Sequence, residues 1–146
     1  MNQTDEQLKT ILNRTGVVAV VGLSPNSARP SYDVGRYLGL NGMRVIPINP
    51  GHAGKEILGE KVYASLADIP ADIQVDMVDI FRKPEHVPPI VDEALETLPN
   101  LTTIWMQLGV VHEAAAAKAR AAGVDVVMDR CTKQEHRRLV GDQRPG

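Results

Sequence analysis

Five short apolar segments, each nearly continuous in hydrophobic character, are the feature that most limits how this chain can fold. They recur at fairly regular intervals, are rich in β-branched residues and do not alternate between apolar and polar positions. Such segments are typical of strands that are buried on both faces of a parallel sheet. The five segments are Val17–Leu23, Arg44–Ile48, Val75–Phe81, Thr102–Met106 and Val124–Met128.

Helical patterns occupy most of the intervals between these segments. In two intervals apolar residues repeat every three or four positions, and Gly or Pro follows where each helix would end. A third interval is rich in alanine, a strong helix former, and is expected to begin at His112 and Glu113. The residues that carry these patterns are Val34, Tyr37 and Leu38 before Gly42, residues 87–98 before Pro99, and residues 112–122 before Gly123.

The length of 146 residues predicts one domain, with a core from about residue 16 to 139. Residues 5–13 predict an amphipathic N-terminal helix, for which Thr4 and Gln7 form a capping box. The tail, residues 141–146, is expected to be frayed.

Alternation of strands and helices predicts an α/β fold: a Rossmann-like doubly wound parallel sheet of five strands with helices on both faces. The exception is the interval 49–73, which is rich in Gly and Pro, with a short extended piece at residues 62–63 and a single helical turn at residues 65–67. Ligands of such sheets bind beyond the carboxyl ends of the strands, where the strand order reverses. We therefore expect the functional site among the loops that follow the five segments.

Composition excludes several classes of protein. Sixteen basic and 18 acidic residues give a net charge of −2, which argues against nucleic acid as the main partner. No apolar run approaches the length of a membrane span, and the polar N-terminus is unlike a secretory signal, so a cytoplasmic protein is expected. One cysteine excludes a disulfide framework, and no histidine or acidic cluster has metal-ligand spacing. Aromatic residues make up only 3%, which argues against an aromatic stacking site.

The loop after the first segment, GLSPNSARPS, has the chemistry of an anion site. Gly22 permits a tight turn, and the start of the next helix offers backbone N–H groups. The hydroxyls of Ser24, Ser27 and Ser31 and the guanidinium of Arg29 add donors that suit phosphate. The loop is not the glycine-rich motif of NAD enzymes, because Ser24 and Ser27 stand where that motif has its second and third glycines. A simple capped turn between strand and helix is the alternative interpretation.

The loop after the second segment argues against NAD. NAD-binding domains place an acidic residue at the end of this strand to hold the ribose diol, whereas here the strand is followed by Asn49 and Pro50. Lys55 and the glycines that follow suit a phosphorylated ribose better than a bare diol.

Five stretches of the sequence follow one another along the chain: GLSPNSARPSYDVGRYL, VIPINPGHAGKEILGEKVYASLADIP, VDMVDIFRKPEHVPPIVDEAL, WMQLGV and VVMDRCTKQEH. In this order and spacing they resemble the small CoA-binding proteins, stand-alone relatives of the N-terminal CoA-binding domain of the succinyl-CoA synthetase α subunit. The resemblance covers the chain from about Gly16 to about Leu139 and implies a Rossmann-like fold that holds coenzyme A or acyl-CoA.

The resemblance also implies roles for individual residues. Phosphate contacts fall to Gly22, Ser24, Arg29 and Ser31, and contacts to the adenosine part fall to Asn49, Pro50 and Lys55. Phe81 and Arg82 close over the ligand, and Gln107, at the end of the fourth segment, can reach the same crevice as a hydrogen-bonding group.

The synthetase α subunit carries a phosphorylated histidine in a second domain, for which this chain is expected to be too short. None of the histidines at positions 52, 86, 112 and 136 matches it. The resemblance therefore implies binding without catalysis. Two alternatives remain open. One is an NAD(P)-dependent oxidoreductase or a sugar-nucleotide-binding domain, and the other is a subunit that docks on a separate ATP-grasp or phosphohistidine-bearing partner to complete an acyl-CoA ligase.

Some residues have both a structural and a chemical interpretation. Cys131 is either a small buried thiol or a thiol that forms a mixed disulfide with bound CoA. One candidate acid/base set consists of His52, Lys55, Lys133, Glu135 and His136. Solvent-exposed charge on loops and on a final helix explains these residues more simply than catalysis does. Trp105 and Met106 are expected to lie in the core.

Overall fold

A five-stranded parallel sheet forms the centre of the computed structural model, which describes residues 3–143. The order of its strands is β2-β1-β5-β6-β7, and every neighbouring pair is parallel. The predicted doubly wound sheet is confirmed, although four of the five strands are shorter than the apolar segments that contain them. The strands are β1 (Val17–Val21), β2 (Arg44–Ile48), β5 (Met77–Ile80), β6 (Thr103–Met106) and β7 (Asp125–Val127).

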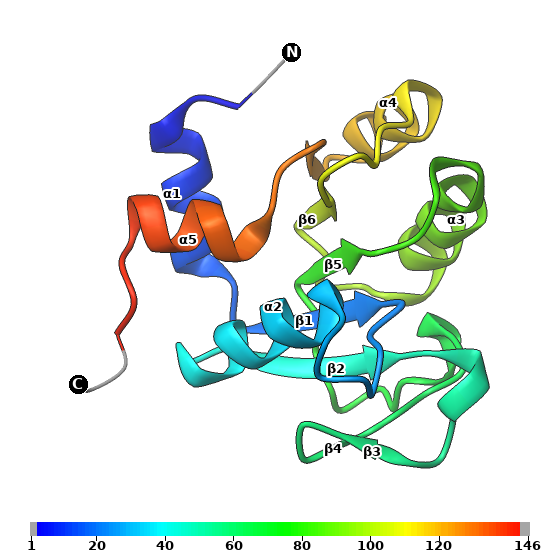
Figure 1. Ribbon diagram of the computed structural model, residues 1–146. Coiled ribbons are helices and arrows are strands. Elements are labelled where there is room, and N and C mark those ends of the chain that lie inside the picture. Colours follow the sequence, from blue (N-terminus) through cyan, green and yellow to red (C-terminus); the bar gives the residue numbers. More distant parts are fainter. Residues whose placement is uncertain (1–2, 144–146) are drawn as a thin grey trace.

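Five helices connect and flank these strands, and they form two layers with the sheet between them (Figure 1). Helices α3 and α4 pack against each other, and α5 packs against both α1 and α2. No helix in the described part of the chain is long and apolar enough to cross a membrane. The helices are α1 (Asp5–Arg14), α2 (Pro30–Leu40), α3 (Val87–Thr97), α4 (Glu113–Ala121) and α5 (Thr132–Leu139).

Two hydrophobic clusters, one on each face of the sheet, explain why the strand segments are apolar throughout. Successive residues of a strand point to opposite faces. In β1, Ala19 and Val21 belong to the cluster that contains the buried residues of α3 and α4, whereas Val18 and Val20 belong to the cluster of α1 and α2. Trp105 is fully buried in the second cluster, as expected.

The interval between β2 and β5 departs most from expectation. It contains a two-stranded antiparallel hairpin, β3 (Glu56–Ile57) and β4 (Glu60–Lys61), which the sequence did not predict. The turn of this hairpin uses Leu58 and Gly59, both with positive φ, and leucine is a poor signal for that conformation.

Short helical turns lie near the sheet. They are η1 (Pro50–His52), η2 (Leu66–Asp68) and η3 (Pro84–His86), of which η2 begins one residue later than the predicted turn at residues 65–67.

The N-terminal helix agrees with expectation. The capping box of Thr4 and Gln7 is present, and α1 extends one residue beyond the predicted end. In the tail, the backbone N–H of Gln143 donates to Asn41 Oδ1 at 2.6 Å. Of the tail predicted to be frayed, residues 144–146 lie outside the described part of the chain.

The strand order reverses between β1 and β5, and the loops that follow them approach each other closely. Gly22 has φ of +90°, and a Cβ at this position would lie 2.7 Å from the carbonyl oxygen of Phe81. The backbone N–H of Gly22 also donates to the carbonyl of Ile48 at the end of β2. Glycine at position 22 therefore lets the loops after three strands converge at one edge of the sheet.

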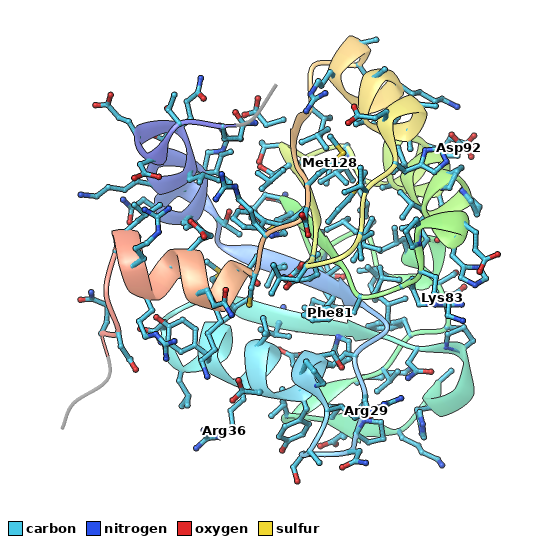
Figure 2. All side chains as sticks on the ribbon, turned by 45° about the horizontal axis from the view of Figure 1, so that its top comes forward. Arg29, Arg36, Phe81, Lys83, Asp92 and Met128 are labelled. Atoms are coloured by element: carbon cyan, nitrogen blue, oxygen red, sulfur yellow. The ribbon has the colours of Figure 1, made fainter. Side chains whose placement is uncertain are left out.

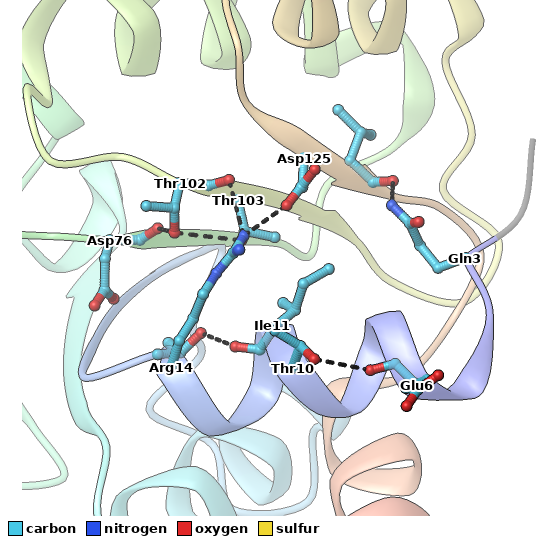
Figure 3. A network of polar contacts seen from close by, with 11 residues as sticks. Gln3, Glu6, Thr10, Ile11, Arg14, Asp76, Thr102, Thr103 and Asp125 are labelled. Carbon is cyan, nitrogen blue, oxygen red and sulfur yellow. Dashed lines mark hydrogen bonds and ion pairs between the residues drawn. The ribbon is translucent and has the colours of Figure 1, made fainter.

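The opposite edge of the sheet is held by α1 (Figure 3). The guanidinium of Arg14 donates to Asp125 Oδ2 at 2.7 Å and to the buried hydroxyl of Thr103 at 3.0 Å. Gln3 Nε2 donates to the carbonyl of Val126 at 3.0 Å. These bonds join α1 to the amino ends of β6 and β7, on the far side of the sheet from Gly22.

Replacement of Arg14 by alanine should reduce the free energy of unfolding by about 1 kcal/mol, because charge-assisted bonds are lost but the side chain is partly exposed. Urea unfolding would measure this change. The matched control is Lys118→Ala, which breaks an exposed pair with Asp92 and should change stability by less than about 0.5 kcal/mol. Equal stability of Arg14→Ala and the wild type would contradict the role given to Arg14.

Candidate functional site

Two adjoining cavities lie at the carboxyl ends of the strands. The first, of about 490 Å³, lies where the loops after β1, β2 and β5 converge. It is lined by eight of the ten residues that the sequence assigned to a site, namely Gly22, Ser24, Arg29, Ser31, Asn49, Pro50, Phe81 and Arg82.

The second cavity, of about 610 Å³, extends from the same place toward the loop after β6 and the start of α5. It shares Pro30, Phe81 and Arg82 with the first cavity, so the two form one continuous depression, which we call the groove. Gln107 lines this second part, as expected of a residue at the end of β6. Lys55 lines neither cavity and is exposed just before the hairpin.

Hydrogen bonds within the loop before α2 fix its conformation. The hydroxyl oxygen of Ser31 accepts a bond from the backbone N–H of Ser24, and that of Ser24 accepts one from Asn26, both at 3.0 Å. The side-chain oxygen of Asn26 accepts a bond from the N–H of Ala28 at 2.9 Å. Three backbone N–H groups of this loop are thus used within the loop itself. An anion at this place would therefore meet mainly the side chain of Arg29 and the serine hydroxyl hydrogens.

Asn49 joins the first two loops to each other. Its Nδ2 donates to the carbonyl of Leu23 at 3.1 Å, while its Oδ1 accepts a bond from the N–H of Gly51 at 3.0 Å. Both ends of the amide are thereby used, so the structure gives Asn49 a positioning role beside the first cavity. Its contribution is to hold the loop that carries Arg29 against the loop that carries Pro50.

The groove is strongly basic although the chain is slightly acidic. Five cationic residues line it, Arg29, Arg82, Lys83, Lys133 and Arg137, against the single carboxylate of Asp33. Lys133 pairs with Asp33 at 2.7 Å, and within residues 3–143 no ion pair involves the other four. Arg29 and Lys83 lie on loops at the same end of the sheet as Phe81 (Figure 2). Such a set of unpaired cations in one groove is suited to a ligand with several negative charges.

A buried polar network lies at the inner end of the second cavity. Gln107 Nε2 donates to Asp79 Oδ1 at 2.8 Å and to Thr132 Oγ1 at 2.9 Å, and the Thr132 hydroxyl donates to Asp79 Oδ2 at 2.9 Å. Asp79 lies in β5 and is fully buried, and this burial raises the pKa of its carboxyl to about 7. Sequence reasoning missed Asp79, although an acidic residue inside the apolar run VDMVDIF was a signal for it.

Cys131 lines the second cavity but is only 7% exposed, so its interpretation as a buried thiol is confirmed. Burial raises the pKa of this thiol, despite the opposing effect of hydrogen bonds from the backbone at the start of α5. The thiol is therefore largely protonated at neutral pH, which reduces its reactivity.

The expectation that the charges of the final helix are solvated is wrong for His136. This residue is buried, its Nδ1 lies 2.8 Å from the hydroxyl of Tyr37, and burial lowers its pKa. The helix packs against α2 through this contact, so only its outer face is solvated. The candidate acid/base residues are also divided, because Lys133, Glu135 and His136 lie on α5 whereas His52 and Lys55 follow β2. Residues 3–143 hold no group of three side chains that could bind a metal ion.

The chain is similar over nearly its whole length to proteins from Bacillus subtilis and Pyrococcus horikoshii. It is 37% identical over 135 residues to the uncharacterized protein YneT of Bacillus subtilis, covering 92% of this chain and 96% of that protein. A hypothetical protein from Pyrococcus horikoshii superposes with a TM-score of 0.87 at 37% identity, covering 95% of this chain and 94% of the other.

A dinucleotide-forming acetyl-coenzyme A synthetase from Candidatus Korarchaeum cryptofilum superposes with a TM-score of 0.64, covering 82% of this chain but 26% of the synthetase chain. At 22% identity this likeness concerns the fold alone. The family model described as a CoA binding domain matches residues 16–137. These residues contain all five strands of the sheet and every residue that lines the groove, and by this match the chain belongs to the CoA-binding domain family.

Proposed function

We propose that this protein binds coenzyme A or an acyl-CoA in the groove. The observation that carries the proposal is the set of four cations without an ion pair, within residues 3–143, that lines the groove of a chain whose net charge is −2. Coenzyme A carries a diphosphate and a ribose phosphate, so it offers several negative charges along an extended ligand. Membership of the CoA-binding domain family supports the same ligand.

The groove suggests how such a ligand would lie. Arg29 and Arg82, which line the first cavity from two different loops, would hold the phosphates, since guanidinium groups match phosphate oxygens well. The adenosine part would lie beside Asn49 and Pro50, with Lys55 near its outer end. The pantetheine arm would then enter the second cavity beside Leu108, which is 57% exposed.

The proposed function is binding without catalysis by this chain. Catalysis at the thioester end of an acyl-CoA requires an activated nucleophile or base near that end. The nucleophile that lines the second cavity, Cys131, is held as a thiol by burial. Binding alone would instead protect, store or present the CoA thioester.

Replacement of Arg29 by alanine should weaken binding of CoA at least about tenfold, because charge-assisted hydrogen bonds to phosphate are lost. Titration calorimetry at low ionic strength would measure this. The matched control is Arg36→Ala, since Arg36 lies on α2, which begins directly after Arg29, but lines neither part of the groove. Equal affinities of the wild type and Arg29→Ala would contradict the site.

A thermal-shift panel of CoA, acetyl-CoA, NAD and NADP separates the proposal from its main alternative. A ligand that binds only the folded state raises the melting temperature. We expect CoA and acetyl-CoA to do so and NAD not to, because Asn49 stands where NAD-binding domains have an acidic residue. Stabilisation by NAD but not by CoA would overturn the proposal.

Incubation of the folded protein with the disulfide of CoA should leave Cys131 unmodified at pH 7, because burial keeps the thiol protonated and shielded. Intact-mass spectrometry would detect a mixed disulfide as added mass. The same incubation in urea is the control and should give the adduct. Rapid modification of the folded protein at pH 7 would show instead that Cys131 is a reactive thiol within the site.

A further inference from the structure

Asp79 is the only fully buried carboxylate in the described part of the chain, and no cation pairs with it. Its neighbours in the sheet are Val20 of β1 and Trp105 of β6, which offer it no charge. Burial of an unpaired carboxylate is unfavourable, and an apolar residue would suit this strand better. The position of Asp79 therefore calls for an explanation beyond the fold.

The hydrogen bonds of the network fix the orientation of one side chain at the groove. Both hydrogens of the Gln107 amide are directed inward, one to Asp79 Oδ1 and one to Thr132 Oγ1. The carboxylate has only acceptors when it is ionised, so it requires the nitrogen of Gln107, not the oxygen, at this position. The Thr132 hydroxyl donates its single hydrogen to the other carboxylate oxygen, which makes it an acceptor for Gln107.

This arrangement leaves Gln107 Oε1 as the free end of the amide. No hydrogen bond to this oxygen is present, yet no buried polar side-chain atom among residues 3–143 lacks a partner. Gln107 lines the second cavity, so its oxygen is open to that cavity. Around it the cavity offers the apolar side chains of Leu108 and Val110. At this place the second cavity thus presents an uncharged hydrogen-bond acceptor beside apolar side chains.

We propose that Asp79 and Thr132 are positioning residues that make Gln107 the acceptor for an amide N–H of the ligand. The inference rests on the proposed function, because the pantetheine arm of CoA has two secondary amides and no charge. A neutral N–H donor suits an uncharged acceptor that lies beside apolar side chains. The unpaired cations recognise the nucleotide, and Gln107 recognises the arm.

Protonation of Asp79 would reverse this selectivity. A protonated carboxyl donates a hydrogen bond, and it would favour Gln107 with its oxygen turned inward and its two donors toward the groove. The pKa of Asp79 is raised to about 7, so the ionised form is present above this pH and is lost as the pH falls through it. Affinity for the arm should therefore decrease from pH 8 to pH 6. The other titratable groups on the two helices of this face nearest the groove are Tyr32, Asp33, Arg36 and Tyr37 of α2, and Cys131, Lys133, Glu135, His136, Arg137 and Arg138 at and within α5.

The test compares two probes in calorimetry: CoA, and 3′-phosphoadenosine 5′-diphosphate with its terminal phosphate as a methyl ester, which has the nucleotide and the phosphate ionisations of CoA without the arm. Gln107→Met keeps the length of the side chain but removes its acceptor. It should weaken the binding of CoA about fivefold to tenfold and leave the affinity for the truncated nucleotide unchanged. Thr132→Val should also weaken the binding of CoA selectively. Thr132→Ser, which keeps the hydroxyl group, should bind CoA with the affinity of the wild type. The matched control is Thr103→Val, because Thr103 is equally buried but lies at the other edge of the sheet.

The pH profile separates positioning from simple packing. The ratio of the two affinities should fall about threefold or more between pH 8 and pH 6 in the wild type and stay constant in Asp79→Asn, which cannot ionise. The ratio cancels the titration of the phosphates, since both probes carry them. The inference would be overturned if Gln107→Met and Thr132→Val each weakened binding of the two probes by the same factor. It would also be overturned if the ratio of the two affinities in the wild type did not change with pH. Neither result would contradict the binding of CoA itself. Failure of both probes to bind the wild type would instead refute the proposed function.

Discussion

The approach of the loop after β1 to the loop after β5 is the constraint on which the groove depends. A side chain at position 22 would collide with the backbone of Phe81, so only glycine lets the two strand ends lie so close. This contact brings Arg29 and Arg82 to the lining of one cavity. Asn49 then links the loop after β2 to the same place through its bond to Leu23. The charge of the groove is therefore concentrated by backbone geometry.

Much of this fold follows from properties that a single sequence displays. Continuous apolar segments indicate strands with two buried faces, and the structure has a cluster of core residues on each face. The edge that carries the site follows in turn, since parallel strands place their carboxyl ends together. Eight of the residues that the family resemblance assigned to the ligand lie at this edge and line one cavity.

The remainder depends on contacts that are distant in the chain. The buried face of α5 is set by Tyr37, which lies 99 residues from its partner His136, so a charged helix appeared solvated throughout. The partners of Asp79 come from β6 and α5, and the sequence alone does not indicate that an amide and a hydroxyl meet this carboxylate. The hairpin was missed because Leu58 adopts a conformation that leucine rarely takes.

The bonds of Arg14 lie at the amino ends of the strands, and the groove lies at their carboxyl ends. Residues that anchor the N-terminal helix are thus separated by the length of the sheet from residues that touch a ligand. Substitutions in the groove loops can then accumulate without loosening that anchor. A chain built in this way can change the ligand it recognises over evolutionary time while the same scaffold persists.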